Sequence, residues 1–191
     1  MDVLESFVFI NASLAQTWPF VTDVSKMAMW AAPLAEPVTD EGVRTLDVAQ
    51  SFDTVLRLPG QPRLHYLVLS LEDGAVETKL DGFLRGLATW HIVPAGRGVI
   101  VHSRIKYELA DRRWLTLWAL GGRWGAALLL NLLLRRLKAR VEDTVGSRRF
   151  GVPLLVSPYA IVVFAALTGA SLGLAGLRVA RWFQPRVGRD E

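Results

Sequence analysis

The sequence predicts an α+β domain followed by one membrane-spanning helix. Over several stretches before residue 110, apolar residues alternate with polar ones, which is typical of antiparallel strands with one face in water. From Trp114 to Val145 the apolar period becomes helical. An uncharged run then extends from Gly151 to Leu177, and a helix needs about 20 apolar residues to cross the hydrocarbon core of a membrane.

The first predicted elements are a strand and two short helices. Ser6–Ile10 is rich in aromatic and β-branched residues, which favour strands. Ser13 and Gln16 have the spacing of a capping box, so a short helix is expected to begin there. A second helical turn is predicted over Lys26–Trp30, before Pro33.

About six further strands are predicted, giving a curved antiparallel sheet of about seven strands. Turn residues at Pro59-Gly60, Glu72–Gly74 and Pro94–Gly98 separate them. The side chains expected on the buried face are Leu46, Val48, Phe52, Leu56, Val76, Thr78, Leu80, Val99, Val101, Ser103, Ile105, Tyr107 and Leu109.

The apolar face of such a sheet needs a cover, and the long C-terminal helix is the only large candidate. Its buried stripe is expected at Leu130, Leu134, Leu137 and Val141. A sheet wrapped around a helix in this way leaves a cavity between them that suits apolar ligands.

Several segments of the chain resemble the START-like superfamily (SRPBCC), which includes polyketide cyclase/dehydrase-type proteins. The resemblance begins with the run SFVFINASLAQTWPFVTDVSKMAMW and covers roughly residues 3–145. The matching positions are Ala12, Thr17-Trp18, Asp23, Trp30, Leu58–Gly60, Phe83–Gly86, Thr89-Trp90 and Gly96–Val99. The resemblance implies a helix-grip fold with a hydrophobic ligand cavity over residues 1–147. The apolar segment, residues 148–183, and a short polar tail, residues 184–191, lie outside the usual pattern of the family.

Charge is distributed unevenly along the chain. Residues 1–110 hold 9 Lys/Arg against 13 Asp/Glu, whereas residues 111–150 hold 9 against 3. A basic block beside a long apolar run favours anionic lipid over nucleic acid as a partner. The residues expected at the membrane surface are Arg135, Arg136, Lys138, Arg140, Arg148, Arg149, Arg178, Arg181 and Trp182.

These flanks predict a single-pass membrane protein with a cytoplasmic N-terminal domain, since Met1–Ile10 does not have the pattern of a secretory signal. A re-entrant hairpin turning near Thr168-Gly169 is the alternative, and a buried helix of a soluble fold is another. The apolar stretch Trp114–Leu134 has several interpretations: it dips into the bilayer, packs on the anchor or on a partner, or forms a first span.

The motifs of common enzymes and cofactor sites are not found. His65, His91 and His102 have no partners at metal-ligand spacing, so no metal site is expected. His65 is expected to face inward, as a core or rim histidine. Nucleotide-binding motifs are absent, no cofactor is predicted, and the lack of cysteine excludes disulfides and thiolate chemistry. No catalytic residue is assigned.

The leading hypothesis is a membrane-anchored protein that binds a hydrophobic small molecule, such as a lipid, isoprenoid or quinone. The predicted cavity residues are Phe52, Thr78, Leu80, Trp90, Val101, Ser103, Ile105, Tyr107 and Leu134. One alternative is an accessory subunit of a membrane complex that packs through its transmembrane helix. Another is a cyclase/dehydrase-like enzyme, whose polar groups would be Tyr107, Ser103, Thr78 and His65.

Overall fold

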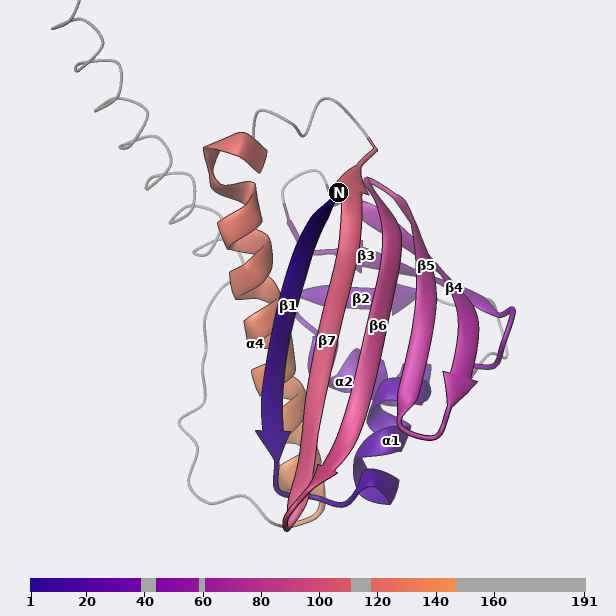
Figure 1. Ribbon diagram of the computed structural model, residues 1–191, viewed down its shortest axis with the longest axis vertical. Coiled ribbons are helices and arrows are strands. Elements are labelled where there is room, and N and C mark those ends of the chain that lie inside the picture. Colours follow the sequence, from indigo (N-terminus) through magenta and orange to yellow (C-terminus); the bar gives the residue numbers. More distant parts are fainter. Residues whose placement is uncertain (39–43, 59–60, 111–117, 147–191) are drawn as a thin grey trace, which may run out of the picture.

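The computed structural model describes residues 1–38, 44–58, 61–110 and 118–146 (Figure 1). The predicted membrane span and its flanks from Arg148 onward lie outside the described residues. Among the helices of the described part, none is long and apolar enough to cross a membrane.

Seven antiparallel strands form one curled sheet, as the sequence predicts. Their order across the sheet is β1-β7-β6-β5-β4-β3-β2, so the first strand pairs with the last. Figure 1 shows β2 and β3 curling round behind β6 and β7. The strands are β1 (Asp2–Ile10), β2 (Ala35–Val38), β3 (Ser51–Leu56), β4 (Arg63–Glu72), β5 (Ala75–Gly82), β6 (Leu84–Ala95) and β7 (Gly98–Leu109).

Two short helices, α1 (Leu14–Thr22) and α2 (Val24–Ala31), follow β1. The predicted capping box is confirmed: the backbone N–H of Gln16 donates to the Ser13 hydroxyl at 3.3 Å, and the Gln16 side chain accepts from the backbone N–H of Ser13 at 2.9 Å. Helix α2 begins two residues earlier than expected because the Asp23 carboxylate caps it, accepting from the N–H groups of the first turn.

The long helix, α4 (Arg123–Thr144), begins later than the predicted Trp114. A π-helical turn, η1 (Trp118–Gly122), precedes it, and Gly121 within this turn has φ of 131°, which breaks the regular helix. Residues 111–117 lie outside the described residues. The predicted buried stripe of α4 is confirmed, since all four of its members are buried.

Helix α4 lies across the inner face of the sheet, behind β1 in Figure 1. Near its C-terminal end, the buried carboxylate of Glu142 accepts the backbone N–H of Asn11 at 2.9 Å. Lys138 donates to the carbonyl oxygen of Phe9 at 2.7 Å and pairs with Glu142 at 3.0 Å. These contacts fix the end of α4 to the junction between β1 and α1.

Two predictions about the sheet faces are wrong. Val48, expected inside, is 51% exposed, because the chain turns at Ala49 (φ 67°) and β3 begins only at Ser51. His65 lies on the outer face, where its Nδ1 is 2.7 Å from the Asp53 carboxylate. In β4 the inward-facing positions are displaced by one residue from the expected ones. Such a displacement moves each side chain of a strand to the opposite face of the sheet.

Because α4 covers the core, two leucine-to-alanine substitutions in this helix should lower the free energy of unfolding by very different amounts. Leu137 is fully buried, so Leu137→Ala should lower the free energy of unfolding by about 2–5 kcal/mol. Leu128 is 43% exposed, so Leu128→Ala should change it by less than about 0.5 kcal/mol. Urea unfolding followed by circular dichroism measures both values, and equal effects would contradict the packing described for α4.

Candidate functional site

A cavity of about 110 Å³, partly open to the outside, lies between the sheet and its helical cover. Inward-facing side chains of β2 to β7 form one side of it, and α2 with the N-terminal half of α4 forms the other. Helix α4 contributes Leu130 and Leu133. An apolar cavity of about 150 Å³ accommodates benzene or xenon, so this space suits small apolar molecules or part of a larger one.

Two aromatic pairs shape the cavity. The rings of Phe52 on β3 and Tyr66 on β4 stack in parallel, with centroids 4.8 Å apart. The rings of Trp30 on α2 and Trp90 on β6 lie 6.1 Å apart at 57°. The alternation of each strand places its aromatic on the inner face, so the two pairs border the same space.

The lining of the cavity is mostly apolar and carries few polar groups. Thr78 Oγ1 donates to the carbonyl oxygen of Ala88 at 3.3 Å, and Trp30 Nε1 donates to the carbonyl oxygen of Phe20 at 2.7 Å. Burial raises the pKa of Tyr66 to about 12, because removal from water disfavours the charged phenolate. Tyr66 is therefore a neutral phenol at physiological pH.

The predicted cavity residues separate into two groups. Phe52, Thr78, Trp90 and Ile105 line the cavity. The others are buried in the core and do not line the cavity; they are Leu80, Val101, Ser103, Tyr107 and Leu134. For Tyr107 the reason is direct contact with Trp118 of η1, whose Nε1 donates to the Tyr107 hydroxyl at 3.1 Å.

Sequence reasoning missed Thr54, Tyr66, Ala88 and Leu133, as well as the contributions of α1, α2 and β2. A signal for Tyr66 is present: Arg63 and His65 alternate with Leu64 and Tyr66, which is the pattern of a strand with one wet face. The apolar residues of α2 give no comparable signal, because a short helix with apolar residues on several sides does not reveal which of them borders a cavity.

The polar groups of the enzyme hypothesis do not meet in one site. Thr78 lines the cavity, Ser103 and Tyr107 are buried outside its lining, and His65 is on the outer face of the sheet. Ser103 Oγ is a buried side-chain atom with no hydrogen-bond partner among the described residues. The four residues therefore do not form the catalytic group that the hypothesis required.

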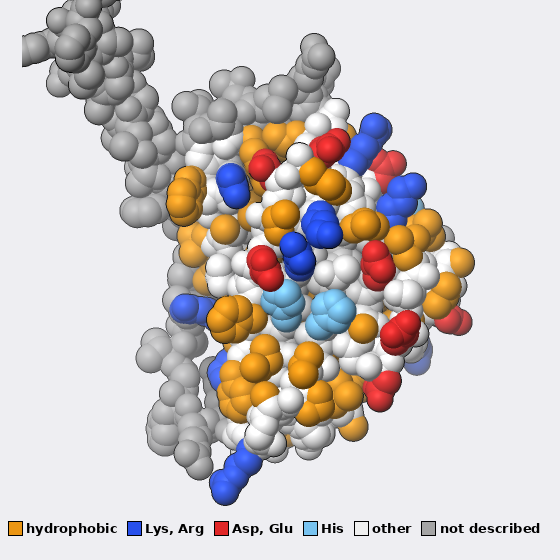
Figure 2. Space-filling model, in the orientation of Figure 1, with side chains coloured by type: hydrophobic (Ala, Val, Ile, Leu, Met, Phe, Trp, Pro, Cys, Tyr) orange, Lys and Arg blue, Asp and Glu red, His pale blue; other side chains and the backbone are white. Residues whose placement is uncertain are grey.

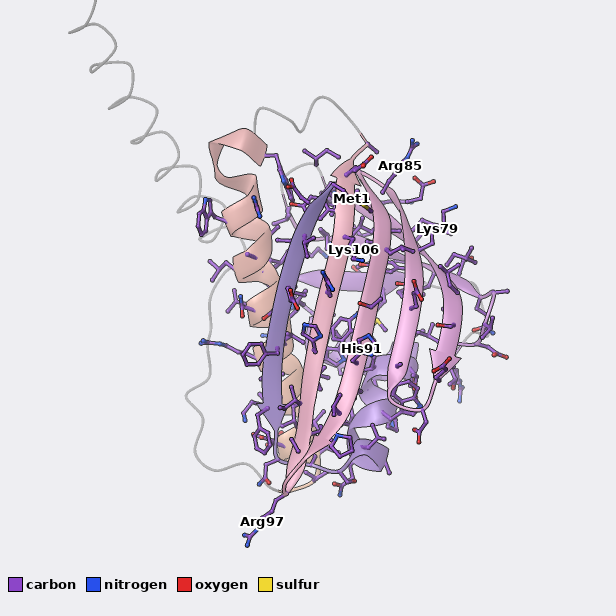
Figure 3. All side chains as sticks on the ribbon, viewed as in Figure 1. Met1, Lys79, Arg85, His91, Arg97 and Lys106 are labelled. Carbon is purple, nitrogen blue, oxygen red and sulfur yellow. The ribbon has the colours of Figure 1, made fainter. Side chains whose placement is uncertain are left out.

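The outer face of the sheet holds a second hollow, of about 390 Å³. His91 and His102 lie beside each other there, with ring centroids 6.5 Å apart, and His102 Nε2 is 2.7 Å from the Glu5 carboxylate. Figure 2 shows the two imidazoles among charges of both signs, and Figure 3 shows His91 and Lys106 on this face. Within the described ranges, no group of three or more potential metal ligands occurs.

Two of the basic residues expected at a membrane surface make contacts within the fold. Lys138 binds Phe9 and Glu142 as described above, and Arg136 Nε donates to the carbonyl oxygen of Trp30 at 3.0 Å. Arg135 and Arg140 are exposed. The remaining members of that set lie outside the described residues; they are Arg148, Arg149, Arg178, Arg181 and Trp182.

Solved structures share this fold. Protein TTHA0849 from Thermus thermophilus aligns with a TM-score of 0.61 at 19% identity, over 75% of this chain and 99% of that one. Protein Ms6760 from Mycobacterium smegmatis aligns with a TM-score of 0.57 at 10% identity, over 72% and 89%. The polyketide-cyclase-like protein Cgl2372 from Corynebacterium glutamicum aligns with a TM-score of 0.52 at 14% identity, over 78% and 97%.

None of the curated proteins compared with the chain matches it. The family described as "Polyketide cyclase / dehydrase and lipid transport" matches residues 1–142, which include all seven strands, both short helices and most of α4. With the helix-grip architecture and the apolar cavity, this match assigns the chain to the polyketide cyclase/dehydrase and lipid transport family of SRPBCC proteins.

Proposed function

We propose that the protein binds a hydrophobic small molecule, such as a lipid, isoprenoid or quinone, in the cavity beneath α4. The observation that carries the proposal is a partly open, mostly apolar cavity between the sheet and its helical cover, lined by buried and half-buried side chains. Ligand pockets of this kind bury apolar molecules and orient them with a few polar groups. The family description, which includes lipid transport, supports the same class of ligand.

We also propose that the domain works beside a bilayer, held there by a transmembrane helix over Gly151–Leu177. The uncharged length of this run and the basic residues at both of its ends support the anchor. Trp124, on the first turn of α4, is 80% exposed, as is typical of side chains that contact the interface of a membrane. Tethering would keep the cavity close to a reservoir of apolar ligands.

A second candidate is an accessory subunit of a membrane complex. Trp124 and the 43%-exposed Leu128, one turn later on α4, favour it, because exposed apolar side chains on a helix also suit a partner helix. Affinity purification in mild detergent separates the two candidates, since an accessory subunit brings its partner with it and a ligand carrier runs alone.

The ligand proposal predicts that filling the cavity removes the ligand. Ala88 lies on the inner face of β6 and lines the cavity, so the ring of Ala88→Phe should occupy the ligand's place and reduce occupancy at least about tenfold. Native mass spectrometry of the full-length protein purified in detergent, with organic extraction of what it carries, measures this occupancy.

Ala75→Phe is the matched control, because Ala75 pairs with the exposed His91 and so lies on the outer face of the sheet. It should keep the ligand at the level of the unmodified protein. Circular dichroism verifies that both variants fold. A protein that carries no apolar molecule, or an Ala88→Phe variant that carries as much as the control, would contradict the proposal.

The anchor proposal predicts that charges in the middle of the run release the protein from membranes. Arginine at a helix centre costs about 2.5–3.5 kcal/mol in membrane insertion, so the double variant Val163→Arg/Phe164→Arg should be extracted by alkaline carbonate, whereas the unmodified protein stays in the membrane pellet. Val187→Arg, beyond the run, should stay in the pellet too. Extraction of the unmodified protein itself would rule out the anchor.

A further inference from the structure

We infer that the cavity selects neutral molecules carrying a hydrogen-bond acceptor, such as a ketone, quinone or ester carbonyl, and that the Tyr66 hydroxyl donates to this acceptor. The inference rests on the ligand-binding function proposed above and specifies the chemistry of the ligand. Three features support the inference: the position of Tyr66 at the cavity, the hydrogen bonding of its hydroxyl, and the charge of the cavity lining.

Tyr66 lies on the border of the cavity. The side chain is surrounded by protein, yet part of its surface is still accessible. Tyr66 is one of the residues that line the cavity. Its ring is held flat against Phe52, which fixes the direction of the hydroxyl.

The Tyr66 hydroxyl has an unused hydrogen-bond donor. It makes no hydrogen bond with any described residue, and the shift of its pKa has burial as its only cause. By contrast, Thr78 and Trp30 donate to backbone carbonyl oxygens of the fold. The hydroxyl is not one of the fully buried side-chain atoms that lack a partner, so it keeps accessible surface and is available for an oxygen of the ligand.

Trp90 adds a second donor to the same lining. Its indole N–H has no hydrogen-bond partner within the described part of the chain, and the residue lines the cavity on β6. An indole N–H only donates, and a neutral phenol has a proton to donate. A lining that offers free donors favours a ligand with an acceptor over a pure hydrocarbon.

The charge of the lining excludes an anionic head group from the interior. None of the described residues that line the cavity carries a charge. A carboxylate would lose its water here without gaining a cation, which strongly disfavours it, whereas a carbonyl needs only one donor. The acceptor that fits is therefore neutral.

The test compares acetophenone and ethylbenzene, which share a phenyl ring and a two-carbon chain and differ in the carbonyl oxygen. Their affinities for the full-length protein in detergent micelles are measured by isothermal titration calorimetry, with empty micelles as the reference. Tyr66→Phe removes only the hydroxyl. It should weaken acetophenone about 3- to 10-fold, the range expected for one neutral hydrogen bond, and change ethylbenzene less than about twofold.

Tyr107→Phe is the matched control, since its hydroxyl is buried outside the cavity lining and bonded to Trp118. Tyr107→Phe should change the affinities for acetophenone and ethylbenzene by less than about twofold, because it removes no hydrogen bond to the ligand.

Benzoate should bind more weakly than acetophenone. If both neutral ligands bind and Tyr66→Phe alters them equally, or if benzoate binds as tightly as the ketone, this inference fails while the ligand-binding function stands. If neither neutral ligand binds the unmodified protein, both fail.

Discussion

The fixed position of α4 on the curled sheet is the constraint on which the rest of the structure depends. Its C-terminal end is held at the junction of β1 and α1 by Glu142 and Lys138, and its buried leucines close the core there. The sheet meanwhile curls round through β3 and β2, and α2 covers that side (Figure 1). The N-terminal half of α4 and α2 do not fill the space over the inner face, and the cavity forms between them.

This geometry explains why the described lining of the cavity is rich in aromatic side chains and carries no charge. Its walls are the inner faces of strands, where alternation admits apolar side chains, and the aromatic pairs Phe52–Tyr66 and Trp30–Trp90 supply large, rigid surfaces at its border. The few polar groups then determine which apolar molecule fits. On the outer face of the sheet, His65 and His102 lie beside the carboxylates of Asp53 and Glu5.

Much of the fold follows from periodicity. The stripe from Leu130 to Val141 and the inward face of β7 were predictable because a helix and a strand repeat their faces with fixed periods. The cavity was predicted only in part, since periodicity assigns a side chain to a face without saying where a helix covers that face. Leu80 and Val101 are therefore packed, whereas Thr78 and Ile105 line the cavity. The membrane anchor stays a prediction from the sequence.

The central claim is that a site for an apolar molecule lies between α2, α4 and the sheet. Diffraction from crystals of the protein held under xenon pressure tests this most directly, because xenon enters apolar cavities without needing a polar partner. The account predicts a xenon atom beside Phe52, Tyr66 and Trp90, on the inner face of the sheet. Side chains that close this space and exclude xenon from it would contradict the account.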